Sequence, residues 1–215
     1  MPKNHHSVSK AIVFIHGLWM NGTDMLLLRH RFKKDGYITF QFKYKSTKKT
    51  PIENARILSE FINSIKFDEI HFVCHSLGGL VIRHYLNLYP IKHSGKIVML
   101  GTPNKTSAVA ESLIKLPLGK KILGKSTEQG LTGALPKWNS KKKLGIIAGQ
   151  FPLASGMLSP VIKGPNDGTV SVEETQLDGA SDHITLCLPH LGLLFSKRAF
   201  LQTKHFLEYS FFIHT

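Results

Sequence analysis

Ser76 is the residue with the clearest capacity for chemistry, because it stands where a strand-like run meets a helical one. Residues 70–74 are apolar and rich in strand formers, and residues 77–89 continue as an apolar helical segment. A serine at such a turn can be held in a strained conformation that exposes its hydroxyl above a sheet, provided that its neighbours two positions away are small. Gly78 is small, and Cys74 is a compact departure from the usual G-x-S-x-G pattern. The simpler alternative is a serine that only caps the helix.

A serine hydroxyl is a poor nucleophile at neutral pH, so it needs a base and a third group that orients the base. Asp167 lies in an Asn-Asp-Gly turn, and His190 directly follows an apolar strand-like run. Both positions lie past strand ends, on the edge where open α/β sheets carry their sites. The order serine, acid, histidine is the one expected on such a sheet. We therefore predict Ser76 as nucleophile, His190 as general base and Asp167 as the orienting acid.

Other residues compete for these roles. Asp167 could be an ordinary turn residue, because Asn-Asp-Gly favours turns. Asp178 and Asp182 are alternative acids, and His183 and His205 are alternative bases. Asp182 and His183 are adjacent at the start of a predicted strand, which would point their side chains to opposite faces.

An oxyanion formed at Ser76 would need two N–H donors. One is expected from Leu77, the residue after the nucleophile, where a helix also begins. The other is expected from Leu18, in the loop after an early strand that reads His-Gly-Leu-Trp. The alternative for this loop is a plain turn. Losing one such donor typically costs about a hundred- to a thousand-fold in rate.

The elements that must position these residues alternate between strands and helices. Buried parallel strands read as nearly continuous apolar runs, and helices show apolar residues three and four apart. Thr50, Pro51 and Glu53 form a capping box, while Thr23 and Asp24 are candidate caps of an earlier helix. The predicted strands are 10–16, 37–44, 70–74, 96–100, 144–149 and 184–188, and the predicted helices are 25–34, 51–65, 77–89 and 193–209. This alternation predicts an α/β fold with a mostly parallel open sheet covered by helices on both faces.

Composition favours one domain over residues 1–215, because 215 residues with 42% hydrophobic content suffice for one core. No run of about 18 apolar residues could span a membrane, and the polar N-terminus does not resemble a signal peptide. We therefore expect a cytoplasmic protein. Peripheral membrane association is left open, and so is the presence of a further segment before Met1. Cys74 and Cys187 lie in apolar runs and are expected to be inert core thiols.

Residues 104–143 interrupt the alternation of strands and helices. This stretch holds nine lysines and two glutamates, a net charge of +7 out of +14 for the chain. We expect an insertion with one amphipathic helix near residues 106–116, followed by loops.

Taken together, these residues resemble the α/β-hydrolase superfamily and, within it, small bacterial esterases and lipases. The resemblance rests on residues 16–17, 74–83, 101–104, 166–171 and 182–190. It implies the α/β-hydrolase fold, with Ser76, Asp167 and His190 in the three catalytic roles and Leu18 and Leu77 as donors. It also implies that residues 104–143 form a cap or lid. Some bacterial lipases place a calcium-binding aspartate just after the catalytic histidine, but residues 190–194 contain none, so we predict neither a metal site nor a cofactor.

The function expected from these residues is cleavage of a carboxylic ester through an acyl-enzyme on Ser76. A thioesterase, amidase or acyltransferase would use the same triad, and a non-catalytic basic binding protein is the remaining alternative. The expected partner is a small-molecule or lipid ester. The basic insertion suggests an anionic membrane surface or a phospholipid, although composition favours a solvated lysine face. Nucleic acid is disfavoured, because no aromatic-interleaved motif or zinc spacing accompanies the charge; the oligomeric state is left open.

Overall fold

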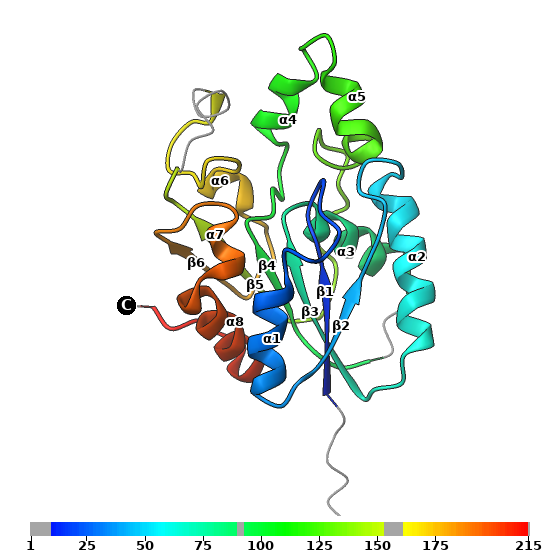
Figure 1. Cartoon of the computed structure of the whole chain (residues 1–215), viewed down its shortest axis with the longest axis vertical. Coiled ribbons are helices and arrows are strands. Elements are labelled where there is room, and N and C mark those ends of the chain that lie inside the picture. The colour runs from blue at the N-terminus through cyan, green and yellow to red at the C-terminus, as the bar shows by residue number, and fades with distance from the viewer. Residues whose placement is uncertain (1–9, 90–92, 153–160, 215) are drawn as a thin grey trace, which may run out of the picture.

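One open sheet of six parallel strands, in the order β2-β1-β3-β4-β5-β6, organises the part of the chain that the structure describes (Figure 1). The structure is a computed structural model and describes residues 10–89, 93–152 and 161–214. The polar N-terminal residues and Pro90, expected just past a helix, lie outside these ranges. The strands are β1 (Lys10–Ile15), β2 (Ile38–Phe42), β3 (Glu69–His75), β4 (Ile97–Leu100), β5 (Leu144–Gly149) and β6 (Asp182–Leu186). The predicted fold class is confirmed, and the sheet is wholly parallel rather than mostly so.

The order of the strands places the active-site candidates side by side. From β1 the chain moves outward to β2 and then returns to the other side of β1 with β3. The connection therefore reverses between β1 and β3, and ligands of open α/β sheets bind at the carboxyl edge of such a switch point. The loop with Leu18 follows β1, and Ser76 follows β3, so this topology brings the two together.

The helices follow the predicted alternation, but the first helix, the last helix and the last strand differ from the predicted bounds or caps. Met25 rather than Thr23 or Asp24 precedes the first helix, and no side chain caps it. The expected last helix is broken at Ser196, whose hydroxyl accepts from two backbone N–H groups and starts a new helix. The last strand also begins two residues earlier than predicted and ends at Leu186. The helices are α1 (Leu26–Lys34), α2 (Pro51–Ser64), α3 (Leu77–Leu88), α4 (Ala108–Leu113), α5 (Gly119–Leu123), α6 (Val172–Thr175), α7 (Gly192–Phe195) and α8 (Lys197–Tyr209), with a 3-10 turn at Gly124–Thr127.

The insertion divides into two regions at opposite edges of the sheet. Its first part forms α4 and α5, which stand beyond the carboxyl ends of the strands at the top of Figure 1. Where one helix near residues 106–116 was expected, two short helices and a 3-10 turn occur. Whether this region works as a lid stays a prediction.

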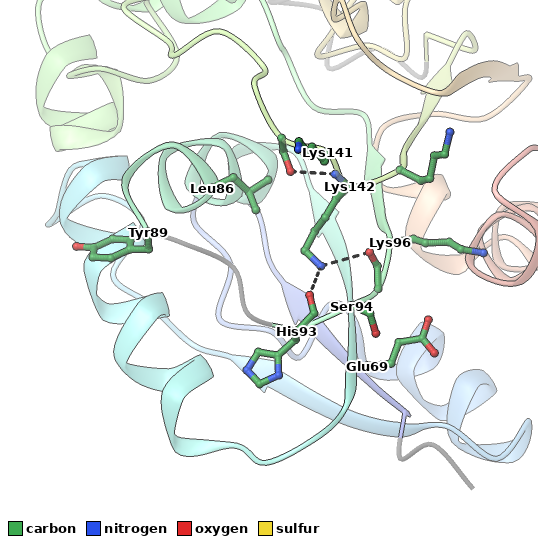
Figure 2. A pocket seen from close by; sticks show the side chains of 11 residues that line it. Glu69, Leu86, Tyr89, His93, Ser94, Lys96, Lys141 and Lys142 are labelled. Carbon is green, nitrogen blue, oxygen red and sulfur yellow. Dashed lines mark hydrogen bonds between the residues drawn. The ribbon is translucent and has the colours of Figure 1, made fainter. Parts of the chain in front are cut away.

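The last three lysines of residues 104–143, which the resemblance assigns to a cap or lid, lie apart from α4 and α5. Lys141, Lys142 and Lys143 line an open cavity of about 570 Å³ near the start of β5, at the amino edge of the sheet. The Lys142 ammonium group donates to the carbonyl oxygens of His93 and Gly95 at 2.8 and 3.3 Å. Figure 2 shows Lys142 pointing toward His93. Burial lowers the pKa of Lys142 to about 8. These three charges therefore lie away from the carboxyl edge that carries Ser76.

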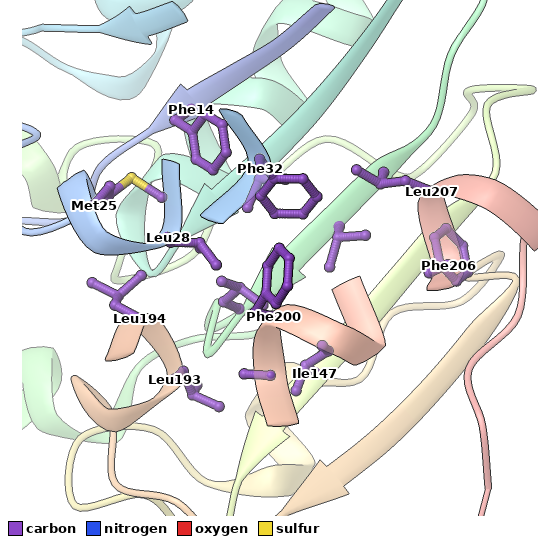
Figure 3. Close-up of a cluster of buried hydrophobic side chains, with 14 of the residues drawn as sticks. Phe14, Met25, Leu28, Phe32, Ile147, Leu193, Leu194, Phe200, Phe206 and Leu207 are labelled. Atoms are coloured by element: carbon purple, nitrogen blue, oxygen red, sulfur yellow. The ribbon is translucent and has the colours of Figure 1, made fainter. Parts of the chain in front are cut away.

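Two apolar layers cover the sheet. On one face, α1, α7 and α8 pack against β1, β4 and β5, and Figure 3 shows the aromatic rings of Phe14, Phe32 and Phe200 meeting there. On the other face, α2 and α3 pack through residues such as Leu58 and Val81. The Thr50 capping box that starts α2 is present as predicted.

The two cysteines differ from the expectation. Cys74 is buried in β3, and burial raises the pKa of its thiol well above the usual value. Cys187 is exposed just past β6, so the prediction of a core thiol is wrong there. None of the described helices has the length and apolarity needed to cross a membrane. A cytoplasmic location stays a prediction of the sequence.

Candidate active site

Ser76 occupies a strained turn between β3 and α3. Its backbone has φ 50° and ψ −121°, a conformation that non-glycine residues rarely adopt, and its side chain does not cap the helix. The Ser76 N–H donates to the carbonyl of Leu100 at 3.0 Å, and its own carbonyl accepts from the Thr102 hydroxyl at 3.0 Å. A Cβ on Gly78 would lie 2.4 Å from the carbonyl oxygen of Ile15. The turn therefore requires a glycine at 78, and the helix-cap alternative for Ser76 does not apply.

A buried Asp167 and a partly buried His190 form a hydrogen-bonded pair. The carboxylate Oδ2 lies 2.7 Å from His190 Nδ1. The other oxygen, Oδ1, accepts from the N–H groups of Thr169 and Val170 at 2.9 and 2.7 Å. The backbone adds a further link, since the His190 N–H donates to the Asp167 carbonyl at 2.9 Å. With Nδ1–H held by the carboxylate, the free lone pair of His190 is on Nε2, the position that a general base requires.

Gly101 sits close enough to this pair to require the absence of a side chain. Its φ is 56°, and a Cβ there would lie 3.0 Å from His190 Nδ1 and 3.1 Å from Asp167 Oδ2. Gly101 directly follows β4 and also donates its N–H to Ile147 of β5. The glycine in the 101–104 motif therefore lets the acid and histidine pack against the sheet edge.

The competing acids and bases are used elsewhere. Asp182 accepts from the Phe212 N–H at 2.7 Å and contacts His214 at 2.9 Å, which ties down the chain after α8. His183 contacts the Thr175 hydroxyl at 2.9 Å, and His205 contacts the Phe211 carbonyl at 2.9 Å. Asp178 is exposed on a turn. None of these residues lines the cavity described next.

Ser76 and His190 line one cavity of about 390 Å³. Its wall is mostly apolar and comes from the loop after β1, from the insertion and from the segment before β6. The apolar lining residues include Leu18, Trp19, Met20, Val109, Ala110, Leu113, Leu123, Leu131 and Val170. Among the hydrogen bonds of the described residues, none joins the Ser76 hydroxyl to His190 Nε2. Catalytic hydrogen bonds often tighten only when substrate is bound. The cavity therefore offers a mostly apolar compartment whose wall includes the Ser76 hydroxyl and the His190 imidazole.

Leu18 lies in the loop after β1 and Leu77 begins α3; their role as oxyanion donors stays a prediction. Both side chains belong to one apolar cluster between the sheet edge and the insertion. Within the described residues, neither backbone N–H has a hydrogen-bond partner, so both remain free to bind an oxyanion. The next residue, Trp19, has φ 59° and donates its N–H to the Ser46 hydroxyl at 3.1 Å. This bond fixes the loop that carries Leu18.

His75 contacts the catalytic candidates directly, a role that sequence reasoning missed. Its Nε2 lies 3.3 Å from the His190 carbonyl oxygen, and the two imidazole rings are 4.7 Å apart. His75 is fully buried, and burial, followed by the nearby His190, lowers its pKa well below the usual value. A neutral His75 that donates to this carbonyl would hold the backbone of His190 in place. Its position directly before Ser76 was the available signal.

His16 and Tyr44 support the loop after β1 in a similar way. Their rings stack with centroids 4.2 Å apart, and the Tyr44 hydroxyl donates to the His16 carbonyl at 2.7 Å. Burial lowers the pKa of His16, which favours the neutral ring. The sequence treated His16 only as part of a turn, because the contact with Tyr44 spans 28 residues.

Arg83 of α3 fastens both ends of the insertion. Its guanidinium donates to the Asn104 carbonyl at 2.7 Å and also to the Pro136 carbonyl. Asn104 in turn donates its amide N–H to the Thr175 carbonyl at 2.8 Å. Burial without a carboxylate partner lowers the pKa of Arg83 to about 10. The base of the insertion is thus held by the same helix that begins at Ser76.

The described residues contain no group of three or more His, Cys, Asp or Glu side chains arranged to hold a metal ion. Both carboxylate oxygens of Asp167 already accept hydrogen bonds from the protein.

Comparison with known proteins finds similarity to a family and to solved structures that are described as esterases and lipases. Residues 5–110 match the family described as "Putative serine esterase (DUF676)". The fold is similar to the mature lipase BlEst2 of Bacillus licheniformis, with a TM-score of 0.72 and 19% identity over 99% of this chain and 96% of the other. It is also similar to the metagenomic carboxyl esterase MGS0156, with a TM-score of 0.67 and 18% identity over 86% of this chain and 65% of the other. A third similar structure is phospholipase PlaB of Legionella pneumophila, with a TM-score of 0.62 and 17% identity over 78% of this chain and 46% of the other. No curated protein matches the sequence. The chain therefore has the α/β-hydrolase fold, and the resemblance to the esterases and lipases of that superfamily, predicted from its motifs, is confirmed.

Proposed function

We propose that the chain is a serine hydrolase that cleaves carboxylic esters with Ser76 as nucleophile, His190 as general base and Asp167 as the residue that orients His190. The observation that carries this proposal is the hydrogen-bonded Asp167–His190 pair, with 2.7 Å between Oδ2 and Nδ1, at the wall of the cavity that also contains the strained Ser76. A buried carboxylate that fixes the Nδ1–H tautomer leaves Nε2 free to accept a proton. Ser107, the other described serine that lines this cavity, accepts from the Ala110 N–H as the cap of α4.

The reaction proceeds in two halves. The Ser76 Oγ attacks the ester carbonyl carbon while His190 Nε2 takes the hydroxyl proton, and the resulting oxyanion accepts from the N–H groups of Leu18 and Leu77. The C–O bond to the leaving group then breaks, and His190 returns its proton to the departing alcohol. In the second half, water attacks the acyl-Ser76 carbonyl, His190 takes the water proton, and the carboxylic acid leaves as Ser76 is reprotonated.

An ester with an apolar acyl chain is the substrate class that the cavity favours. Most of the lining side chains are apolar, and a volume of about 390 Å³ is at the small end of the range for ligand sites. The matched proteins named lipase, carboxyl esterase and phospholipase support the ester among the reactions open to this triad. A thioesterase, an amidase or an acyltransferase would differ only in leaving group or acceptor. Rates on matched ester, thioester and amide substrates distinguish the hydrolases, and added alcohol acceptors reveal acyl transfer.

A fluorophosphonate probe tests the proposal, because it reacts only with an activated serine. Wild type is expected to be labelled on the peptide that contains Ser76, and Ser76→Ala is expected to lose both the label and the hydrolysis of p-nitrophenyl butyrate. Ser107 is the matched control, since it also lines the cavity but caps α4 by accepting from the Ala110 N–H. Ser107→Ala should keep the label on Ser76. Label that persists in Ser76→Ala would assign the nucleophile to another residue.

A further inference from the structure

The segment between α4 and α5 presents apolar side chains to solvent at the carboxyl edge of the sheet. We call residues 115–122 the tip; it stands at the top of Figure 1, beyond the strands. Leu116, Leu118 and Ile122 are 45%, 63% and 50% exposed. Packing in the core therefore does not explain why these three positions carry apolar side chains. Leu113 and Leu123 differ, because they line the cavity below.

Positive charge surrounds the exposed leucines. Lys115, Lys120 and Lys121 belong to the tip and are exposed, and the sequence from 112 to 127 contains no acidic residue. Among the described residues, none of these three ammonium groups is in an ion pair. Lys105, nearer the base of the insertion, does pair with Glu173. The tip is thus a site where apolar and uncompensated basic side chains alternate.

The tip lies directly beside the mouth of the active-site cavity. Trp19, which lines that cavity, donates its indole N–H to the Ile122 carbonyl at 3.0 Å. Trp19 is itself 59% exposed. Its large apolar ring therefore extends the surface of the tip to the rim of the cavity, next to the loop with Leu18.

We propose that the tip docks on an anionic lipid surface, with Leu116, Leu118 and the Trp19 ring entering the boundary between headgroups and acyl chains. Apolar side chains flanked by lysines suit this boundary, because the chains leave water while the ammonium groups remain near anionic headgroups. A polyanion such as RNA would match the charge but not the exposed leucines. The inference does not need catalysis by Ser76, although it would place the mouth of the proposed ester site at the lipid surface.

Sedimentation with vesicles tests the charge requirement. Wild type is expected to bind vesicles of phosphatidylcholine with 30 mol% phosphatidylglycerol, and not pure phosphatidylcholine, at low salt. Lys115→Gln/Lys120→Gln/Lys121→Gln should weaken binding by roughly a hundred-fold, because each basic residue near an anionic surface contributes about five-fold. The matched control Lys33→Gln/Lys34→Gln/Lys141→Gln removes three exposed lysines at the other end of the molecule. Equal losses in the two triple variants would overturn the proposal.

The apolar requirement has its own variant. Leu116→Ser/Leu118→Ser should weaken vesicle binding by about ten-fold or more, while hydrolysis of a soluble short-chain ester stays unchanged, because neither leucine lines the cavity. Vesicle binding that is unaffected by this change would refute insertion of the tip. Binding to RNA or heparin that exceeds vesicle binding and depends on the same lysines would also refute a lipid partner.

Tryptophan fluorescence reports where the tip goes. The chain has two tryptophans, and Trp138 is half-buried away from the tip. We expect a blue shift on addition of anionic vesicles in wild type and in Ser76→Ala, and no shift in Trp19→Phe. Ser76→Ala separates this inference from the proposed function, since it abolishes hydrolysis but should leave docking intact. A blue shift that persists in Trp19→Phe, or its absence in wild type, would contradict docking through this rim.

Discussion

Replacing Asp167 by asparagine should abolish catalysis while leaving the fold nearly unchanged. Oδ1 of Asp167 accepts from two N–H groups at 2.9 and 2.7 Å, and Oδ2 lies 2.7 Å from His190 Nδ1. Asparagine has only one acceptor oxygen, and the two N–H donors will hold it at the Oδ1 position. Its NH₂ group then faces His190, which forces Nδ1 to accept and places the ring proton on Nε2. A histidine in that tautomer cannot take the serine proton.

The expected loss in kcat is about 10⁴-fold, the effect of the wrong tautomer in a triad, or about 5.5 kcal/mol in the activation free energy. Asp167→Ala should differ, because it also leaves two buried N–H groups unpaired, at about 1–3 kcal/mol of folding free energy each. Hydrolysis of p-nitrophenyl butyrate and thermal melting of both variants separate the two effects. Asp178→Asn, on an exposed turn, is the control and should keep full activity.

Two outcomes would contradict the role of Asp167 in setting the tautomer of His190. Asp167→Asn that keeps more than about a tenth of wild-type kcat would mean that His190 does not depend on this carboxylate. A comparable loss in Asp182→Asn, with its folding intact, would shift the acid role to that residue. Either result would leave the tautomer argument without support.

Three further predictions concern stability and substrate. Burial lowers the pKa of His71 to about 4 despite the nearby Glu69, so between about pH 6.5 and 4 the unfolded chain binds a proton that the folded chain does not. Protonation of this residue in the unfolded chain should therefore lower the free energy of unfolding by about 3 kcal/mol as pH drops through that window. Thermal melts of wild type and His71→Asn should diverge there. If Tm falls equally in both proteins between pH 6.5 and 4, the lowered pKa of His71 is wrong. Gly78→Ala should lower the free energy of unfolding by about 3 kcal/mol, which corresponds to a fall in Tm of roughly 6–12 °C. The reason is that the alanine Cβ would lie 2.4 Å from the Ile15 carbonyl oxygen. An unchanged Tm in calorimetry would contradict this close approach. In a p-nitrophenyl ester series, kcat/KM should rise about four-fold per added CH₂, as for about 0.8 kcal/mol of burial, until the cavity is filled; a flat profile would mean that the acyl chain does not enter it.

The sequence predicted the elements whose signals are local. The Thr50 capping box, the strand runs and the serine turn are each encoded within a few residues, and the structure has all three. The pairing of Asp167 with His190 could be anticipated because parallel strands end at a common edge. Their selection over Asp182 and His183 depends on contacts that only the folded chain reveals.

The errors share a physical origin in tertiary structure. The break at Ser196 was missed because apolar residues continue on both sides of it, and only a capping serine marks the start of α8. The lysines of residues 141–143 were grouped with the rest of residues 104–143 because they belong to the same sequence insertion. A segment that joins parallel strands must return from the carboxyl end of β4 to the amino end of β5, so its last residues necessarily lie at the opposite edge. The role of His75 depends on His190, which is 115 residues away.

Under the proposed mechanism, Ser76 carries the acyl group during the reaction. The most direct measurement is mass spectrometry of protein mixed with a p-nitrophenyl ester and quenched in acid within the first turnover. We predict an added mass equal to the acyl group, located on the peptide that contains Ser76 and absent from Ser76→Ala. Turnover without any such adduct, or an adduct on a different residue, would contradict the proposed mechanism.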